Sequence, residues 1–231
     1  MLTQIKDEAL VLQASDCKED GRIVSLFTFQ HGIIKIFINA KGKDSSRQRA
    51  LSTPLTLLTV SCQINRGDLY RCLDAKIIDQ HLELRKNLEV LESASHMARS
   101  TLRSQATHVA APNLYLLLKS YLKLLSFSIS PESILSSYQL KLLRHEGFLA
   151  SLTSCPLCLK DQTIQIQSWA SGEFYCREHS PSANIYFPIE EYTALYQLAS
   201  SKSTNILKEM NAPERLRKKI NGMFLEMTNS Q

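Results

Sequence analysis

Residues 21–40, GRIVSLFTFQHGIIKIFINA, hold two runs of strand-forming residues on either side of a tight turn. Arg22–Phe29 and Ile33–Ala40 are rich in isoleucine, valine, phenylalanine and threonine, which favour extended backbone. His31-Gly32 between them is a turn signal. The stretch therefore predicts a β-hairpin with His31 at its bend.

This hairpin belongs to a longer series of strand-like runs that extends from Glu8 to Ile78. Ala9–Ala14 precedes it, and Leu55–Ile64 and Leu69–Ile77 follow it, with glycine-containing turn signals between the runs. Five short strands at this spacing are typical of a small closed barrel, and an OB-fold is the five-stranded barrel that also binds oligonucleotides. The sequence predicts an OB-fold, with an SH3-like barrel as the alternative.

Beyond Asp79, apolar residues recur at steps of three and four, which is the spacing of one helical face. Prolines, which favour the first turn of a helix, introduce later helices at Pro112, Pro131, Pro188 and Pro213. The faces expected in the core are Leu84, Leu88, Leu91, Ser95, Ala98 and Leu102; Leu114, Leu117, Leu118, Tyr121, Leu122 and Leu125; Ile134, Leu135, Tyr138, Leu142 and Leu143; and Leu216, Ile220, Met223, Phe224 and Met227.

Four metal-ligand residues stand at regular spacing in the last third of the chain. Cys155-Pro156-Leu157-Cys158 is followed, after seventeen residues, by Cys176-Arg177-Glu178-His179. Each pair can form a tight knuckle, and a hairpin between the pairs can bring the knuckles together, as in a zinc ribbon. We therefore expect Cys155, Cys158, Cys176 and His179 to bind one structural Zn²⁺.

Two other interpretations of these cysteines fit less well. A redox Cys-x-x-Cys needs a βαβ context, which the preceding residues do not supply. In zinc deaminases the ligand-x-Glu element precedes the Pro-Cys-x-x-Cys element, whereas Cys176-Arg177-Glu178 follows it here. A closed set of four protein ligands also leaves no position for water or substrate.

Together these patterns predict an α+β protein with a boundary near residue 80. We expect residues 1–80 to form an OB-fold DNA-binding domain and residues 81–231 to form an α-helical domain. A zinc-ribbon hairpin at about residues 150–185 is expected to interrupt the helices.

The formal net charge of +5 is compatible with a polyanionic ligand. Lys41, Lys43, Arg47 and Arg49 gather in and after one predicted barrel connection, where a cationic loop can contact phosphates. We expect these four residues to bind DNA. Tyr70 on the last predicted strand is a candidate for base stacking, with a place in the core as its commoner alternative.

Enzymatic chemistry has little support in the sequence. Asp16, Glu19 and Asp20 are close together, but they surround a predicted turn, where solvated acids are the ordinary case. The sequence contains no GxxxxGK[ST] phosphate loop. We expect a non-enzymatic protein; the alternatives are a scaffold whose barrel binds protein and, with less support, a metal-dependent hydrolase.

The sequence gives no sign of export or membrane insertion. Met1–Glu8 is charged, and no apolar run approaches the ~20 residues that a membrane span needs. Cys17, Cys62 and Cys72 have no disulfide-framework spacing. We expect a cytoplasmic, nucleoid-associated protein with reduced thiols.

Several motifs in order resemble one bacterial family, the DNA repair protein RecO. In the barrel region these are Glu19–Thr28, His31–Lys35, Ala40-Lys41-Gly42 and Ala50–Leu55. Later in the chain they are Tyr138–Leu143, Gly147-Phe148 before Cys155–Cys158, and Ser171–Cys176. The sequence departs from the family's usual pattern in having His179 in place of a cysteine and fewer cations after Gly42.

The resemblance implies a recombination mediator. RecO proteins bind single- and double-stranded DNA, anneal complementary strands, associate with RecR, contact single-strand-binding protein and help to load RecA. A protein of this kind needs no nucleotide site of its own, which agrees with the absence of a phosphate loop from the sequence.

Overall fold

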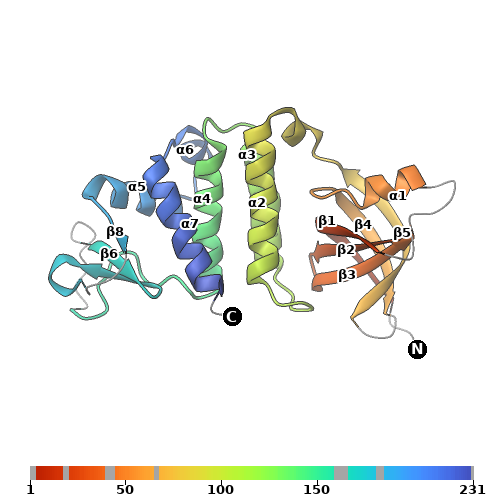
Figure 1. The fold of residues 1–231 in the computed structure, drawn as a ribbon, viewed down its shortest axis with the longest axis horizontal. Helices are drawn as coiled ribbons and strands as arrows, with labels where there is room; N and C mark the ends of the chain where they lie inside the picture. Colours follow the sequence, from red (N-terminus) through yellow and green to blue (C-terminus); the bar gives the residue numbers. More distant parts are fainter. Residues whose placement is uncertain are drawn as a thin grey trace. The chain divides into compact units, whose positions relative to one another are not determined.

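A computed structural model of the chain describes residues 4–17, 21–39, 45–64, 68–158, 166–180 and 185–229. Contacts between Cα atoms divide the chain into two compact units, Met1–Leu122 and Lys123–Gln231. The first unit contains a β-barrel, and the second contains several helices and a small three-stranded sheet (Figure 1). The predicted α+β class is confirmed.

The barrel has five strands: β1 (Gln4–Cys17), β2 (Gly21–Thr28), β3 (Gly32–Asn39), β4 (Leu57–Ile64) and β5 (Leu69–Asp79). They close in the order β1-β2-β3-β5-β4, with β3 and β5 parallel and all other pairs antiparallel. A short helix, α1 (Ser45–Leu51), connects β3 to β4. This five-stranded closed arrangement confirms the predicted OB-fold over the SH3-like alternative.

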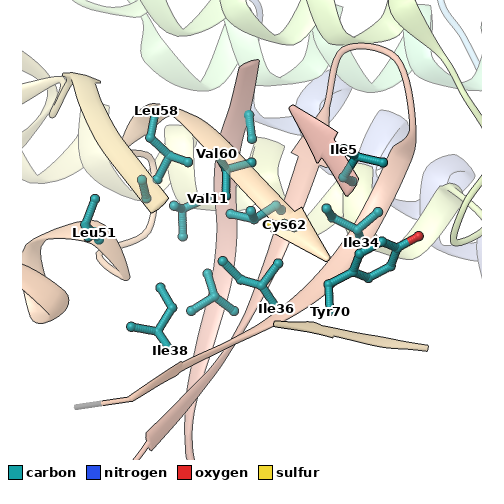
Figure 2. Packing of buried hydrophobic residues seen from close by; sticks show 14 residues of the cluster. Ile5, Val11, Ile34, Ile36, Ile38, Leu51, Leu58, Val60, Cys62 and Tyr70 are labelled. Atoms are coloured by element: carbon teal, nitrogen blue, oxygen red, sulfur yellow. The ribbon is translucent and has the colours of Figure 1, made fainter. Parts of the chain in front are cut away.

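Alternating residues of the strands fill the barrel with apolar side chains. Ile34, Ile36 and Ile38 of β3 all point inward and are nearly or fully buried (Figure 2). Valine and isoleucine favour strands because their branched side chains pack on a pleated surface. Each such side chain stabilises the fold by roughly 1.5–3 kcal/mol when it is fully buried. The barrel is therefore held together by its own apolar core.

The first helical region differs from the sequence prediction. A 3-10 helix, η1 (Leu82–Lys86), precedes α2 (Leu88–Ser104), and the Asn87 side chain caps α2 by accepting a hydrogen bond from the Val90 N–H. The predicted face is confirmed at Leu84 and Ala98, which are buried, but it is wrong at Leu88, which is 70% exposed, because the face was counted across this break. Leu91, Ser95 and Leu102 are half-buried. The face that α2 buries consists of Val90, Ser93, Ala94, Met97, Ala98, Ser100, Thr101 and Ser104.

The connection between α2 and α3 (Pro112–Leu125) packs onto the β2–β3 hairpin. The His108 N–H donates a hydrogen bond to the Ile33 carbonyl at 3.0 Å. Gly32 lies in the left-handed region at φ +69°, and a Cβ there would lie 2.0 Å from the Val109 carbonyl oxygen. Only glycine fits this position, so Gly32 both forms the hairpin bend and admits the neighbouring chain.

The predicted core face of α3 is largely confirmed, since Leu114, Leu118, Tyr121, Leu122 and Leu125 are buried. Its Tyr115 packs edge to face against Phe27 and Phe29, with ring centroids 5.6 and 5.7 Å apart. The first unit therefore extends beyond the strands to Leu122. That residues 1–80 form a domain of their own, with a boundary near residue 80, stays a prediction.

The second unit is built around α4 (Pro131–His145), which contacts α5 (Ile189–Ser200), α6 (Thr204–Glu209) and α7 (Glu214–Asn229). The helix starts predicted at Pro131, Pro188 and Pro213 are confirmed within one residue. The inward faces of α4 and α7 are also confirmed, except that Leu135 and Met227 are only half-buried. Helix α6 was not predicted.

A three-stranded sheet lies between α4 and α5 in the chain. It consists of β6 (Ile166–Ala170), β7 (Glu173–Cys176) and β8 (Ile185–Tyr186), in the order β7-β6-β8. Phe174 of β7 lies 6.1 Å from both Phe187 and Tyr192, measured between ring centroids. The hairpin predicted within residues 150–185 is therefore present and packs against the start of α5.

Candidate metal centre and nucleic-acid interface

Cys155, Cys158, Cys176 and His179 lie together in the second unit, with all four ligand atoms within 4.8 Å of one another. Cys155 and Cys158 flank a turn, and Cys176 ends β7. A single 3-10 turn, η2 (Arg177–His179), then brings His179 back to the cysteines. The β6–β7 hairpin and two short turns thus assemble the group that the spacing predicted.

The group can hold a metal ion. His179 Nδ1 lies 3.2 Å from Cys176 Sγ and 3.9 Å from Cys155 Sγ. A tetrahedral Zn²⁺ with ordinary bond lengths requires sulfur-to-nitrogen edges of about 3.6 Å, between these two distances. Cys155 and Cys176 are buried, and the other two are half-buried. Because four protein ligands fill a tetrahedron, the arrangement suits a structural role rather than a catalytic one.

The surroundings of Cys155 favour the thiolate that binds metal. Burial raises the pKa of the Cys155 thiol, but hydrogen bonds from the backbone N–H groups of Cys176, Cys158 and Leu157 outweigh burial and lower the pKa to about 6. Burial raises the pKa of the neighbouring Cys176 thiol. One ligand is therefore ready as an anion near neutral pH, and the metal would draw the proton from the other.

Only part of the predicted DNA-binding set lies among the described residues. Arg47 and Arg49 lie on α1 and are exposed, whereas Lys41 and Lys43 lie outside the described residues. The expectation of a loop was wrong for the two arginines, because residues 45–51 form a helix. Arg47 donates a hydrogen bond from Nη2 to the Ala75 carbonyl at 3.3 Å, which holds α1 against β5.

Tyr70 does not offer a free stacking surface. Its side chain belongs to the barrel core and is 8% exposed. Its ring is already stacked on His108, with centroids 5.7 Å apart and planes at 29°. The core alternative is therefore the correct one for Tyr70.

The carboxylates considered for hydrolysis do not form a metal site among the described residues. Asp16 is exposed and pairs with Arg22 at 2.9 Å. Glu19 and Asp20 lie outside the described residues. In the part of the chain that the structure describes, the Cys/His group is the one cluster of three or more side chains fit for a metal.

A small pocket lies between β3, α1 and β5 and was not predicted from the sequence; Phe37, Asn39, Arg47 and Gln48 are among the residues that line it. Phe37 stands at an outward position of β3, between the inward Ile36 and Ile38. The alternation of the strand was the signal that could have found it. Among the described residues, no helix is long and apolar enough to cross a membrane.

Comparison with known proteins matches nearly the whole chain to one family. Residues 1–81 match the model for the recombination protein O N-terminal region, and residues 85–225 match that for the recombination protein O C-terminal region. The DNA repair protein RecO of Thermoanaerobacter sp. (strain X514) is 29% identical over 174 residues, 74% of this chain and 69% of the relative. That of Clostridium kluyveri is 27% identical over 213 residues, 90% of this chain and 81% of the relative. That of Chlamydia trachomatis serovar L2 is 25% identical over 202 residues, 86% of this chain and 82% of the relative.

Proposed function

Because the chain belongs to the recombination protein O family, we propose that it is a DNA repair and recombination mediator that binds single- and double-stranded DNA and anneals complementary strands. The observation that carries this proposal is the match of both family regions, in order, over nearly the whole chain. The OB-fold barrel agrees with it, because such barrels bind oligonucleotides.

The proposed mechanism is the concentration of two polyanions on cationic surfaces. Arg47 and Arg49 are exposed on α1, and phosphates that bind there release condensed counterions. Lys41 and Lys43 complete the proposed DNA-binding set. Two strands held by such contacts can meet and pair without chemistry at either backbone, so the protein works without nucleotide and is not an enzyme.

The Cys/His group is proposed to hold a structural Zn²⁺. Cys155, Cys158, Cys176 and His179 supply three sulfur donors and one nitrogen donor, which is a common donor set for structural zinc. When bound, the ion would tie the β6–β7 hairpin to the turn at Cys155–Cys158. The metal acts on folding in this proposal and takes no part in DNA annealing.

The partners proposed for the protein follow from its family. They are RecR, single-strand-binding protein and, indirectly, RecA, which the mediator would help to load on coated single-stranded DNA in the cytoplasm. Affinity capture with purified RecR and with purified single-strand-binding protein tests each contact separately.

An annealing assay tests the proposed function. Two labelled complementary oligonucleotides are mixed with the protein, with and without ATP and magnesium, and a denaturing gel detects cleavage. We expect faster pairing in all conditions and intact strands. Cleavage would favour the hydrolase alternative, and neither binding nor annealing would favour a protein scaffold.

A further inference from the structure

A pocket of about 210 Å³ lies in the barrel unit at the place where β3 and β5 separate. The two parallel strands are paired as far as Phe37 and Arg71, and α1 contacts β5 beyond that point. The pocket is smaller than the roughly 300–1,000 Å³ of sites for drug-sized ligands. It therefore suits one ring system rather than an extended molecule.

One wall of the pocket is the ring of Phe37. The side chain is half-buried and lies on the outer side of β3, because Ile36 and Ile38 point into the barrel (Figure 2). The ring rests on Gly21 of β2: a Cβ at that glycine would lie 2.3 Å from two atoms of the ring. The backbone of β2 thus supports a partly exposed aromatic surface at the pocket.

The opposite wall is polar and comes from α1. The side-chain oxygen Oε1 of Gln48 is buried, and it has no hydrogen-bond partner among the described residues. An unpaired buried acceptor costs about 1–3 kcal/mol, and a rotation of the Gln48 side chain toward the pocket would let this oxygen accept a hydrogen bond from a ligand. Arg47, also on α1, is an exposed residue that lines the pocket, and its Nη2 donates a hydrogen bond to the Ala75 carbonyl.

The described lining of the pocket carries one basic residue, Arg47, and one acidic residue, Asp74. Arg49 on α1 and Arg71 on β5 are exposed and adjoin the lining residues Gln48 and Cys72 in sequence. With these two arginines the basic residues outnumber the acidic one, which favours an anionic ligand. A small ring compound, neutral or acidic, would contact only part of this surface. A nucleotide within a strand supplies a ring with hydrogen-bond donors at its edge for the pocket, and a charged phosphate on each side of the ring for the arginines.

We propose that this pocket binds one unpaired base of single-stranded DNA, with Phe37 against the base, Gln48 at its edge and Arg47 near the adjoining phosphate. The inference rests on the proposed function and adds a base-binding position to it. A base inside a duplex is stacked on both sides and cannot enter a pocket unless it is flipped out. The pocket therefore distinguishes single strands from duplexes, which the exposed arginines alone do not.

An affinity comparison with and without bases tests the proposal. The probes are a labelled thymidine oligonucleotide and an abasic strand of the same length and charge. The chain variants are wild type, Phe37→Leu, Gln48→Leu and, as a matched control, Phe127→Leu, which replaces an exposed phenylalanine of the second unit. Leucine keeps an apolar contact with Gly21 but removes the aromatic surface.

We expect Phe37→Leu to weaken binding of the thymidine strand about 5- to 100-fold, the loss of one base–aromatic contact. The same variant should bind the abasic strand and a blunt duplex as wild type does. Gln48→Leu should show a smaller loss of the same kind, and Phe127→Leu should show none. Equal affinity of Phe37→Leu and wild type for the thymidine strand would overturn the proposal.

A second measurement uses the wild-type protein. Cys72 lines the pocket and is partly exposed, and a hydrogen bond with Cys62 lowers the pKa of its thiol. Alkylation of Cys72 by iodoacetamide, followed by mass spectrometry, should slow when the thymidine strand is present. The abasic strand should leave the rate unchanged. Cys17, also partly exposed, is the internal control.

Together, the two measurements show whether the base-binding pocket or the proposed DNA-binding function is wrong. If wild type binds the thymidine strand while Cys72 is not protected and Phe37→Leu has no effect, the base pocket is wrong and DNA binding stands. If the wild-type protein binds neither of the single strands nor the duplex, the proposed DNA-binding function itself is wrong. Protection of Cys72 by both strands would indicate phosphate contact alone and would also overturn the base pocket.

Discussion

The β1–β5 barrel and the β6–β7 hairpin with its Cys/His group are stabilised in different ways. The barrel closes five strands around an apolar cluster of fourteen buried residues among those that the structure describes. The hairpin sheet has strands of five, four and two residues. The Cys/His group joins it to the turn at Cys155, and the Ala150 N–H donates a hydrogen bond to the Gly172 carbonyl just before that turn. A long closed sheet can bury a core of its own, whereas a short one needs ligands or a neighbour.

The chain carries a convenient reporter for this difference. Trp169, its single tryptophan, lies in β6 and is fully buried. Fluorescence of Trp169 therefore reports on the hairpin, while amide exchange of β1–β5 reports on the barrel. The two regions can be followed separately in one protein.

The largest expected effect is the loss of the metal. Cys155→Ser, or removal of the ion by a chelator, should unfold the hairpin, because structural zinc supplies an apparent ~10–16 kcal/mol in small domains. Each aromatic contact of Phe174 supplies only about 0.5–1.5 kcal/mol beyond its burial. We expect Trp169 emission to shift to the red and barrel amide protection to persist. Cys17→Ser is the matched control.

Elemental analysis of the untreated protein completes this test and should give about one zinc per chain. A protein without metal whose Trp169 is nonetheless buried would contradict the comparison, since the short sheet would then be stable alone. Barrel amides that lose protection together with the hairpin would show that the two regions depend on one another.

Acid should release the metal from the hairpin and leave the barrel folded. Without metal, the pKa of the Cys155 thiol is lowered to about 6 from an ordinary value near 9, so its thiolate predominates in the folded protein at neutral pH and is lost as the pH falls through 6. The stabilisation that depends on this thiolate is complete above the unfolded pKa near 9 and is lost as the pH falls through the folded pKa. Bound zinc competes with protons for the ligands, so Trp169 emission and released zinc, measured together from pH 8 to pH 4, should change only below about pH 6. Zinc release that is complete above pH 6 would contradict this account.

Removal of core volume should act on the barrel instead. Ile36 is 1% exposed, and Ile36→Ala should lower the free energy of unfolding by about 2–5 kcal/mol through lost burial and a cavity. Ile78→Ala is the control, because that side chain is 49% exposed. Denaturant unfolding followed by circular dichroism and amide exchange measures both. An equal loss in the two variants would show that packing inside the barrel is not the main source of its stability.

The smallest expected effect concerns DNA. Replacement of Arg47 and Arg49 by alanine should weaken binding of any single strand and reduce the slope of log K against log salt by up to about 1.4, two contacts at about 0.7 each. Arg177→Ala, in the turn before His179, is the matched control in the hairpin and should change neither. Fluorescence anisotropy at several salt concentrations measures the slope. An unchanged slope in the double variant would move the phosphate contacts away from α1.

The elements whose signals are local could be predicted from the amino-acid sequence. Strand alternation predicted the five barrel strands, and proline at a first turn predicted the starts of α3, α4, α5 and α7. The spacing of four ligand residues predicted the Cys/His group, because two tight turns on one hairpin bring such residues together wherever the hairpin packs. These features depend on neighbours a few residues away, or on one hairpin.

The features that depend on residues far apart in the chain could not be predicted in this way and are seen in the folded protein. The break between η1 and α2 shifted the buried face to Val90, Ala94 and Met97, which a count of apolar positions does not show. Tyr70 lies in the barrel core, and His108, thirty-eight positions later, stacks on its ring. The pocket beside Phe37 exists because β3 and β5 separate next to α1. Packing between segments far apart in the chain selects these arrangements, and no local pattern records it.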